Sequence, residues 1–175
     1  MDYSIPKEET PKKPVTVPVK RRSWKRKTLF ILLVIFIGMQ LYQPDKNNND
    51  VIAANSIISI IPIPDSVNAI LRVACYDCHS NNTHYPWYSN IQPGGWWLAT
   101  HVKEGKQNLN FDEFATYSRE KQTDKLTGIK KSQQDDWMPL DSYKWIHADA
   151  NLKEAQKKLL IDWADSAINQ LRVKN

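Results

Sequence analysis

The two cysteines of the chain stand three residues apart, and a histidine follows the second one directly. In this C-x-x-C-H pattern, Cys75 and Cys78 can form thioethers with the two vinyl groups of a haem, and His79 can ligate the iron. Such a site needs a fold that wraps a large, flat macrocycle, so it constrains the architecture more than any other feature. We expect one covalent haem c, with His79 as the proximal iron ligand.

Three other uses of the cysteine pair remain open. A thioredoxin-like redox site would lie at a strand–helix junction, and no such pattern surrounds the pair. A zinc site would need further ligands, but the chain has no second cysteine pair and its other histidines are scattered. A plain disulfide would need only an oxidising compartment. We favour haem because it accounts for the adjacent histidine as well.

A low-spin haem needs a second axial ligand, which is usually methionine or histidine. Met138 is the one methionine after the apolar N-terminal segment, and the proline that follows it restrains the backbone. We expect Met138 as the distal iron ligand, although a single methionine more often fills a gap in a core. His101, in a predicted helix, is the alternative distal ligand. His84 follows His79 too closely to reach the opposite face, and His147 is expected in solvent.

A stretch without any charged residue, 28–44, follows a cluster of basic residues. Trp24 and Tyr42 bracket it as interfacial aromatics do, so we expect a single-pass transmembrane helix in the inner membrane. A cleaved signal peptide and a buried core helix are the alternatives. Because the basic residues precede the helix, residues 1–27 are expected in the cytoplasm and residues 43–175 in the periplasm.

The first 27 residues carry a net charge of +6 and the rest of the chain −1, which together give the overall +5. The part of the chain that can fold is close to neutral, so we expect no nucleic-acid surface on it. The expected partners are membrane-bound or periplasmic redox proteins and the lipid bilayer. We divide the chain into a disordered basic tail (1–27), a membrane anchor (28–44), a linker (45–61) and a haem-binding domain (62–175).

Helical spacing dominates the predicted domain, and no strand is evident after residue 65. A proline-rich stretch ends at Pro64, and an apolar stripe at helical spacing then leads into the cysteine motif. Asn151 and Glu154 form a capping pair for a final helix, and the polar residues 121–134 suggest a solvated helix. Most of the six tryptophans after the tail are expected in the core. The expected fold is all-α and cytochrome c-like, with four or five helices around one haem.

Several separated blocks of the sequence, in order, resemble the small bacterial haem-binding domain family of c-type cytochromes, which is common in Bacteroidetes-like bacteria. The blocks are Cys75-Tyr76-Asp77-Cys78-His79-Ser80-Asn81, Tyr85-Pro86-Trp87-Tyr88-Ser89-Asn90-Ile91-Gln92-Pro93, His101-Val102-Lys103-Glu104-Gly105, Leu109-Asn110-Phe111 and Met138-Pro139. The resemblance covers roughly residues 60–170. It implies one covalent haem, with His79 as proximal and Met138 as distal ligand. Leu140 departs from the family, which tends to have a second proline there, and this departure loosens the loop.

The expected function is one-electron transfer by a membrane-anchored periplasmic cytochrome. The alternative is a haem-based sensor or ligand-binding module whose sixth coordination position is open or displaceable. We do not expect an enzyme, because the sequence offers no evident set of acid–base groups for the distal side of the iron.

Overall fold

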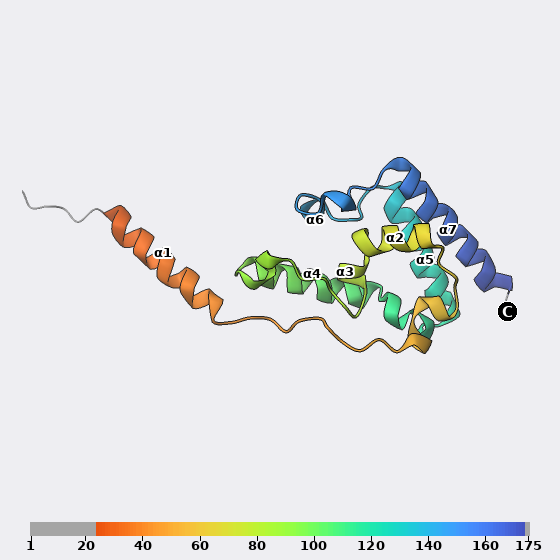
Figure 1. Ribbon diagram of the computed structural model, residues 1–175, viewed down its shortest axis with the longest axis horizontal. Coiled ribbons are helices and arrows are strands. Elements are labelled where there is room, and N and C mark those ends of the chain that lie inside the picture. Colours follow the sequence, from red (N-terminus) through yellow and green to blue (C-terminus); the bar gives the residue numbers. More distant parts are fainter. Residues whose placement is uncertain (1–23, 174–175) are drawn as a thin grey trace, which may run out of the picture. The chain divides into compact units, whose positions relative to one another are not determined.

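The computed structural model describes residues 24–173, and every regular element within them is a helix (Figure 1). The all-α prediction is confirmed for this part of the chain. Asn48 and Asn82 form an isolated β-bridge, but residues 24–173 contain no strand. The α-helices are α1 (Trp24–Gln40), α2 (Asp65–Ala74), α3 (Tyr76–His79), α4 (Gly94–Asn108), α5 (Arg119–Gln134), α6 (Asp141–Lys144) and α7 (Glu154–Val173). The 3-10 turns are η1 (Ala53–Asn55), η2 (Ile57–Ser59), η3 (Trp87–Asn90), η4 (Phe111–Thr116) and η5 (Ala148–Ala150).

The chain divides into two compact units between Ile37 and Gly38. Helix α1 begins at Trp24 and ends at Gln40, and basic residues occupy its first turn. Its uncharged part is therefore shorter than the roughly 20 residues that a membrane-spanning helix needs. No helix among residues 24–173 combines the length and apolar character needed to cross a membrane, so the transmembrane helix expected over 28–44 is not observed. The predicted tail lies outside the described residues, except that 24–27 are helical.

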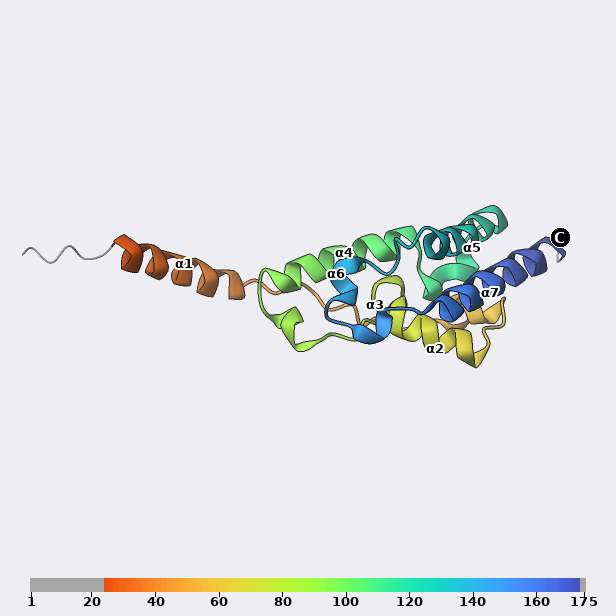
Figure 2. The same cartoon turned by 90° about the horizontal axis from the view of Figure 1, so that it is seen from above.

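The second unit has its core where α2, α5 and α7 meet. Helix α2 begins at Asp65 directly after Pro64, as predicted, and it buries the apolar stripe that leads to the cysteine motif. Helices α5 and α7 lie side by side in both views (Figures 1 and 2). Burial of each large apolar side chain stabilises such a core by about 1.5–3 kcal/mol. The largest fully buried apolar residues are Ile57, Ile61, Val67, Leu71, Phe114, Leu126, Leu160 and Leu171.

Helix α5 is not the solvated helix that its polar sequence predicted. Its buried residues recur at helical spacing and form one stripe that packs against α7. They are Gln122, Leu126, Ile129, Ser132 and Gln133. The prediction was wrong because two glutamines belong to this stripe, and the amide side chains of both form hydrogen bonds to backbone carbonyls. On helix α7, Leu160 is buried whereas the neighbouring Leu159 is exposed.

Residues 45–61, predicted as a linker, belong to the second unit and pack on the rest of it. Ile57 and Ile61 are each only 1% exposed and belong to the core. The Asn47 amide nitrogen Nδ2 donates to the Ser80 carbonyl at 2.9 Å, and the Asn47 carbonyl accepts from the Thr83 N–H at 3.0 Å. This segment therefore braces the chain directly after the cysteine motif.

Most tryptophans of this unit lie at the surface, contrary to the prediction. Trp163 is 6% exposed because it belongs to the buried face of α7, and its indole N–H donates to the Pro62 carbonyl at 3.2 Å. Trp87 in η3 and Trp145 directly after α6 are 76% and 84% exposed.

Candidate functional site

The cysteine motif forms the corner between α2 and α3. Cys75 ends α2, and its N–H donates to the Leu71 carbonyl at 2.9 Å. The chain turns there, and the His79 N–H donates to the Cys75 carbonyl at 3.0 Å. A single turn of backbone thus presents both cysteines and His79, and the cysteines are free thiols in this structure.

The two thiols lie in an environment that keeps them protonated. Burial raises the pKa of Cys75 to about 12, with a further contribution from Cys78. Burial also raises the pKa of Cys78 to about 11, and the negative charge of Asp77 adds to this effect. A thioredoxin-like site requires a lowered thiol pKa, so this geometry does not favour that alternative. Within residues 24–173, no three His, Cys, Asp or Glu side chains form a group that could hold a metal ion such as zinc.

One ring nitrogen of His79 forms a hydrogen bond to the backbone. Its Nδ1 lies 3.0 Å from the Leu109 carbonyl oxygen. A carbonyl can only accept, so Nδ1 carries the proton and Nε2 keeps the lone pair. Burial lowers the pKa of His79, although hydrogen bonds to backbone carbonyls act in the opposite direction. Histidines that ligate metals commonly have this arrangement, which fixes both the tautomer and the ring orientation.

Two adjoining cavities, of about 300 and 360 Å³, open beside the corner. Each lies within the range of small-molecule sites. Both are lined by Ala74, Cys75, His79, Asn108 and Met138. Cys78 and His101 line the smaller cavity only. The structure therefore brings together the cysteines, His79 and both candidate distal ligands, which the sequence separates by up to about 60 residues.

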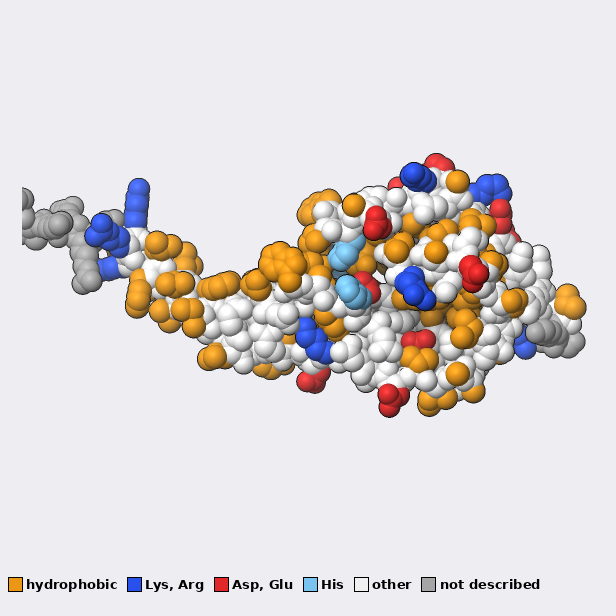
Figure 3. All heavy atoms as spheres, viewed as in Figure 1, with side chains coloured by type: hydrophobic (Ala, Val, Ile, Leu, Met, Phe, Trp, Pro, Cys, Tyr) orange, Lys and Arg blue, Asp and Glu red, His pale blue; other side chains and the backbone are white. Residues whose placement is uncertain are grey.

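The remaining histidines line neither cavity. His147 stacks on Tyr143 with ring centroids 4.0 Å apart. With His84 it lines a larger, separate hollow of about 870 Å³ that neither cysteine reaches. Figure 3 shows histidine side chains together with acidic and basic ones on one face of the second unit. This hollow is lined by neither cysteine nor by Met138, although Asp77 and Tyr143 line both it and the smaller cavity.

Two glycines show how the site is shaped. A Cβ at Gly105 of α4 would lie 2.5 Å from the Cys78 carbonyl oxygen, so α4 packs directly against the motif backbone. Gly128 of α5 lines the larger cavity, and a Cβ there would meet no atom within 4 Å. A glycine inside a helix costs about 1 kcal/mol relative to alanine, and this one leaves room in the cavity. Sulfur and imidazole donors around such a space fit a haem.

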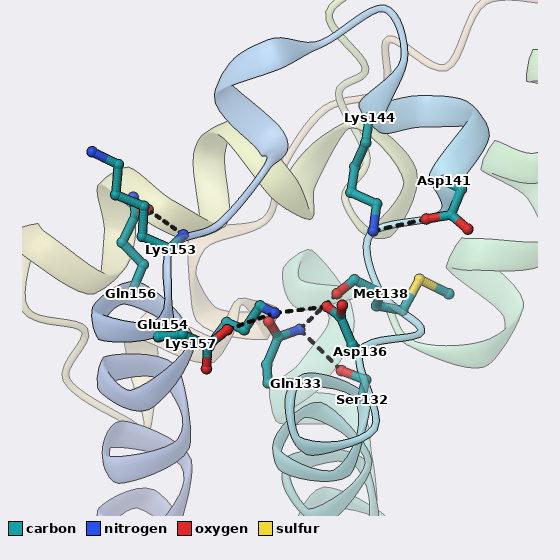
Figure 4. Close-up of polar contacts among 10 residues, drawn as sticks. All are labelled: Ser132, Gln133, Asp136, Met138, Asp141, Lys144, Lys153, Glu154, Gln156 and Lys157. Carbon is teal, nitrogen blue, oxygen red and sulfur yellow. Dashed lines mark hydrogen bonds and ion pairs between the residues drawn. The ribbon is translucent and has the colours of Figure 1, made fainter.

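Met138 lies on the loop between α5 and α6. The Gln133 Nε2 atom donates to the Met138 carbonyl at 3.2 Å, and Lys157 of α7 pairs with Asp136 at 2.9 Å. Asp136 has a φ of 54°, a conformation that aspartate tolerates better than most residues. Figure 4 shows the Met138 sulfur extending away from this polar cluster. The loop is therefore held by its backbone, which leaves the thioether to face the cavities.

A second contact joins the loop region to the cysteine motif. The Tyr143 hydroxyl of α6 donates to Asp77 Oδ2 at 2.8 Å, and Asp77 lies between the two cysteines. Burial and the Asp77 carboxylate both raise the pKa of Tyr143, so the hydroxyl remains a proton donor. Asp77 also accepts from the His84 N–H at 3.0 Å. The motif and the methionine loop are thus parts of one hydrogen-bonded assembly.

Sequence reasoning missed three residues of this site. Gln133 was placed on a solvated helix, yet it is 5% exposed, and its spacing from Leu126 and Ile129 could have revealed it. Gly128 had no signal beyond being a glycine within a helical pattern. Tyr143 lies 66 residues from its partner Asp77, and no local pattern predicts that contact.

Comparison with known proteins gives one match. The model of a family described as a haem-binding domain matches residues 34–166, a span that contains every residue discussed in this site. No curated protein and no solved structure matches the chain.

Proposed function

The chain belongs to the haem-binding domain family, and on that premise we propose that it is a c-type cytochrome that carries one covalent haem and transfers single electrons. The observation that carries the proposal is the meeting of Cys75, Cys78, His79 and Met138 at two adjoining cavities. The hydrogen bond from His79 Nδ1 to the Leu109 carbonyl supports it, because that bond leaves Nε2 available to iron.

Each residue has a defined role in this proposal. Cys75 and Cys78 hold the haem through thioethers, and His79 and Met138 supply the axial nitrogen and sulfur. When bound, haem supplies an iron that gains or loses one electron. The Leu109 carbonyl orients the imidazole ring, and the apolar walls around the thiols exclude water. Methionine together with histidine gives a higher potential than two histidines.

We propose an electron carrier rather than an enzyme, with membrane-bound or periplasmic redox proteins as partners. The near-neutral charge of the chain after residue 27 supports protein partners over nucleic acid. Haem is attached to C-x-x-C-H motifs outside the cytoplasm, and basic residues followed by an apolar stretch are typical of an export segment. We therefore propose that the haem domain functions in the periplasm. Fractionation of cells, followed by haem staining of the proteins in each fraction, tests this. Haem protein found only in the cytoplasm would contradict it.

The second candidate function is a sensor with a displaceable sixth ligand, and the position of His101 favours it. Its Nδ1 atom lies 2.8 Å from the Trp97 carbonyl oxygen, which leaves Nε2 with the lone pair, as in His79. His101 lines the same cavity as Met138, so two different side chains are candidates for one coordination position. Optical spectra of the Met138→Ala and His101→Ala variants identify the resident ligand. Displacement of this ligand from the parent protein by added imidazole would favour the sensor, and resistance to displacement would favour electron transfer.

The central test is a haem stain after denaturing electrophoresis. Protein matured in a host competent for cytochrome c should stain, because only thioether-linked haem survives denaturation. The Cys75→Ala, Cys78→Ala double variant should not stain, whereas the Met138→Ala variant should. An unstained parent protein would overturn the proposal.

A further inference from the structure

Haem carries its two propionates on the edge opposite the vinyl groups. A haem tethered at the α2–α3 corner therefore needs other walls of the cavities to receive two carboxylates. The charged residues of the two cavities differ in sign. The smaller is lined by Asp77, Glu104 and His101, and the larger by Asp124, Lys125 and Lys131.

We propose that Lys125 and Lys131 of α5 bind the haem propionates and so fix the orientation of the macrocycle. The proposal rests on the proposed function, because it presupposes a haem attached at the cysteines. It assigns a role to α5, which contributes neither a thioether nor an axial ligand.

Lys125 is held at the rim of the site. Its side chain is 22% exposed, and its Nζ atom lies 3.1 Å from Asn108 Oδ1. Asn108 ends α4 and lines both cavities. Asp124 is 3.8 Å from the same Nζ atom, but this carboxylate is 74% exposed, so the pair contributes little and leaves the ammonium free to bind another anion.

Lys131 lines the same cavity as Lys125. Gly128 is three residues from each of the two lysines, a spacing that places it beside both on the helix surface. A Cβ at Gly128 would meet no atom within 4 Å. Lys131 forms no ion pair with any residue of the described part of the chain. The larger cavity therefore has two lysines in its wall and open space at the glycine between them.

The smaller cavity is unsuited to the carboxylates of the propionates. Asp77 and Glu104 line the smaller cavity, and like charges at close range raise the cost of placing propionates there. The charge distribution therefore favours the α5 side for the propionate edge of the haem.

The assignment has two measurable consequences. Lysine charges near the iron favour the reduced state, because it carries one positive charge fewer, so their loss should lower the midpoint potential. Lysines also favour the ionised propionate, so their loss should raise the pKa of the propionic acids. The pH at which the potential begins to shift should therefore rise.

Spectroelectrochemical titration of the full-length holoprotein over a range of pH tests these consequences. The Lys125→Gln, Lys131→Gln double variant should have a lower potential and a propionate-linked shift at higher pH, whereas Lys125→Arg should retain the parent values. Lys130→Gln is the matched control, because Lys130 pairs with Asp165 at 2.8 Å and lines neither cavity. Lys130→Gln should behave as the parent.

A second measurement does not depend on the redox couple. Full-length protein produced without haem is titrated with free haem and with haem dimethyl ester, whose propionates carry no charge. The parent should bind the free acid more tightly, and in the double lysine variant the ratio of the two dissociation constants should fall toward one.

Two results would overturn the assignment. One is a double lysine variant that matches Lys130→Gln in potential, pH profile and ester preference. The other is His101→Gln producing these shifts in place of the lysine variants, because the propionates would then face α4. A parent protein that fails the haem stain would instead refute the proposed function, so the two failures are distinguishable.

Discussion

The two sides of the candidate haem site are built differently. The cysteine side is one turn of helix, with hydrogen bonds between residues a few positions apart and α4 packed against it through Gly105. The methionine side is a loop that depends on distant partners, namely Gln133, Lys157 and the Tyr143–Asp77 contact. Local hydrogen bonds therefore define the backbone turn of the cysteine side, whereas residues distant in sequence hold the methionine loop. We expect the two sides to respond differently to substitution.

The sharpest way to separate the sides is to remove each proposed axial ligand. His79→Ala should give the larger effect, because it removes the ligand that the motif itself positions, and we expect loss of the low-spin spectrum together with a low yield of holoprotein. Met138→Ala should retain covalent haem and lose only the spectral features of sulfur ligation. Optical spectra of both oxidation states measure this, and equal effects from the two variants would break the distinction.

Gly105→Ala should disturb the cysteine side most among the conservative changes. The added Cβ would lie 2.5 Å from the Cys78 carbonyl oxygen, and such overpacking costs about 1–3 kcal/mol. Gly128→Ala is the matched control, because its Cβ meets no atom within 4 Å and alanine favours the helix by up to about 1 kcal/mol. Urea unfolding of the haem-free protein should show opposite signs for the two variants.

Gln133→Ala should loosen the methionine side. It removes the hydrogen bond to the Met138 carbonyl, which is worth about 0.5–1.5 kcal/mol, and added imidazole should then displace the sixth ligand more readily. Gln122→Ala is the control, because its amide bonds to the Phe114 and Tyr117 carbonyls, away from the loop. Both variants should lose similar stability. Imidazole binding that is unchanged in Gln133→Ala would show that the glutamine does not position Met138.

The smallest expected effect is a pH dependence of the loop. The hydrogen bond and charge of Lys157 lower the pKa of Asp136, so the stability that this pair contributes is present above the usual value of 3.8 and is lost as the pH falls through the lowered pKa. The difference in unfolding free energy between the parent and Asp136→Asn should shrink over that acid range. A difference that is constant with pH would show that the pair does not stabilise the loop.

The sequence predicts the cysteine side well because the signals there are short-range. The proline at 64, the apolar stripe and the motif lie within about 16 residues of one another, and α2 forms as they indicate. The burial of α5 was mispredicted because glutamine is usually a surface residue, whereas Gln122 and Gln133 are buried with their amides bonded to carbonyls. The contacts that hold the methionine loop were also not predicted, because the residues that make them come from three different helices.

The Tyr143–Asp77 hydrogen bond also bears on the order in which the site is assembled. It closes a loop of 66 residues, and the entropy of closing a flexible loop of that size costs about 4 kcal/mol. Because this cost must be met before the contact stabilises the fold, long-range contacts slow folding. We therefore expect the cysteine corner to form before the methionine loop joins it. In that order of events the thiols would be accessible to haem before the Tyr143–Asp77 contact forms.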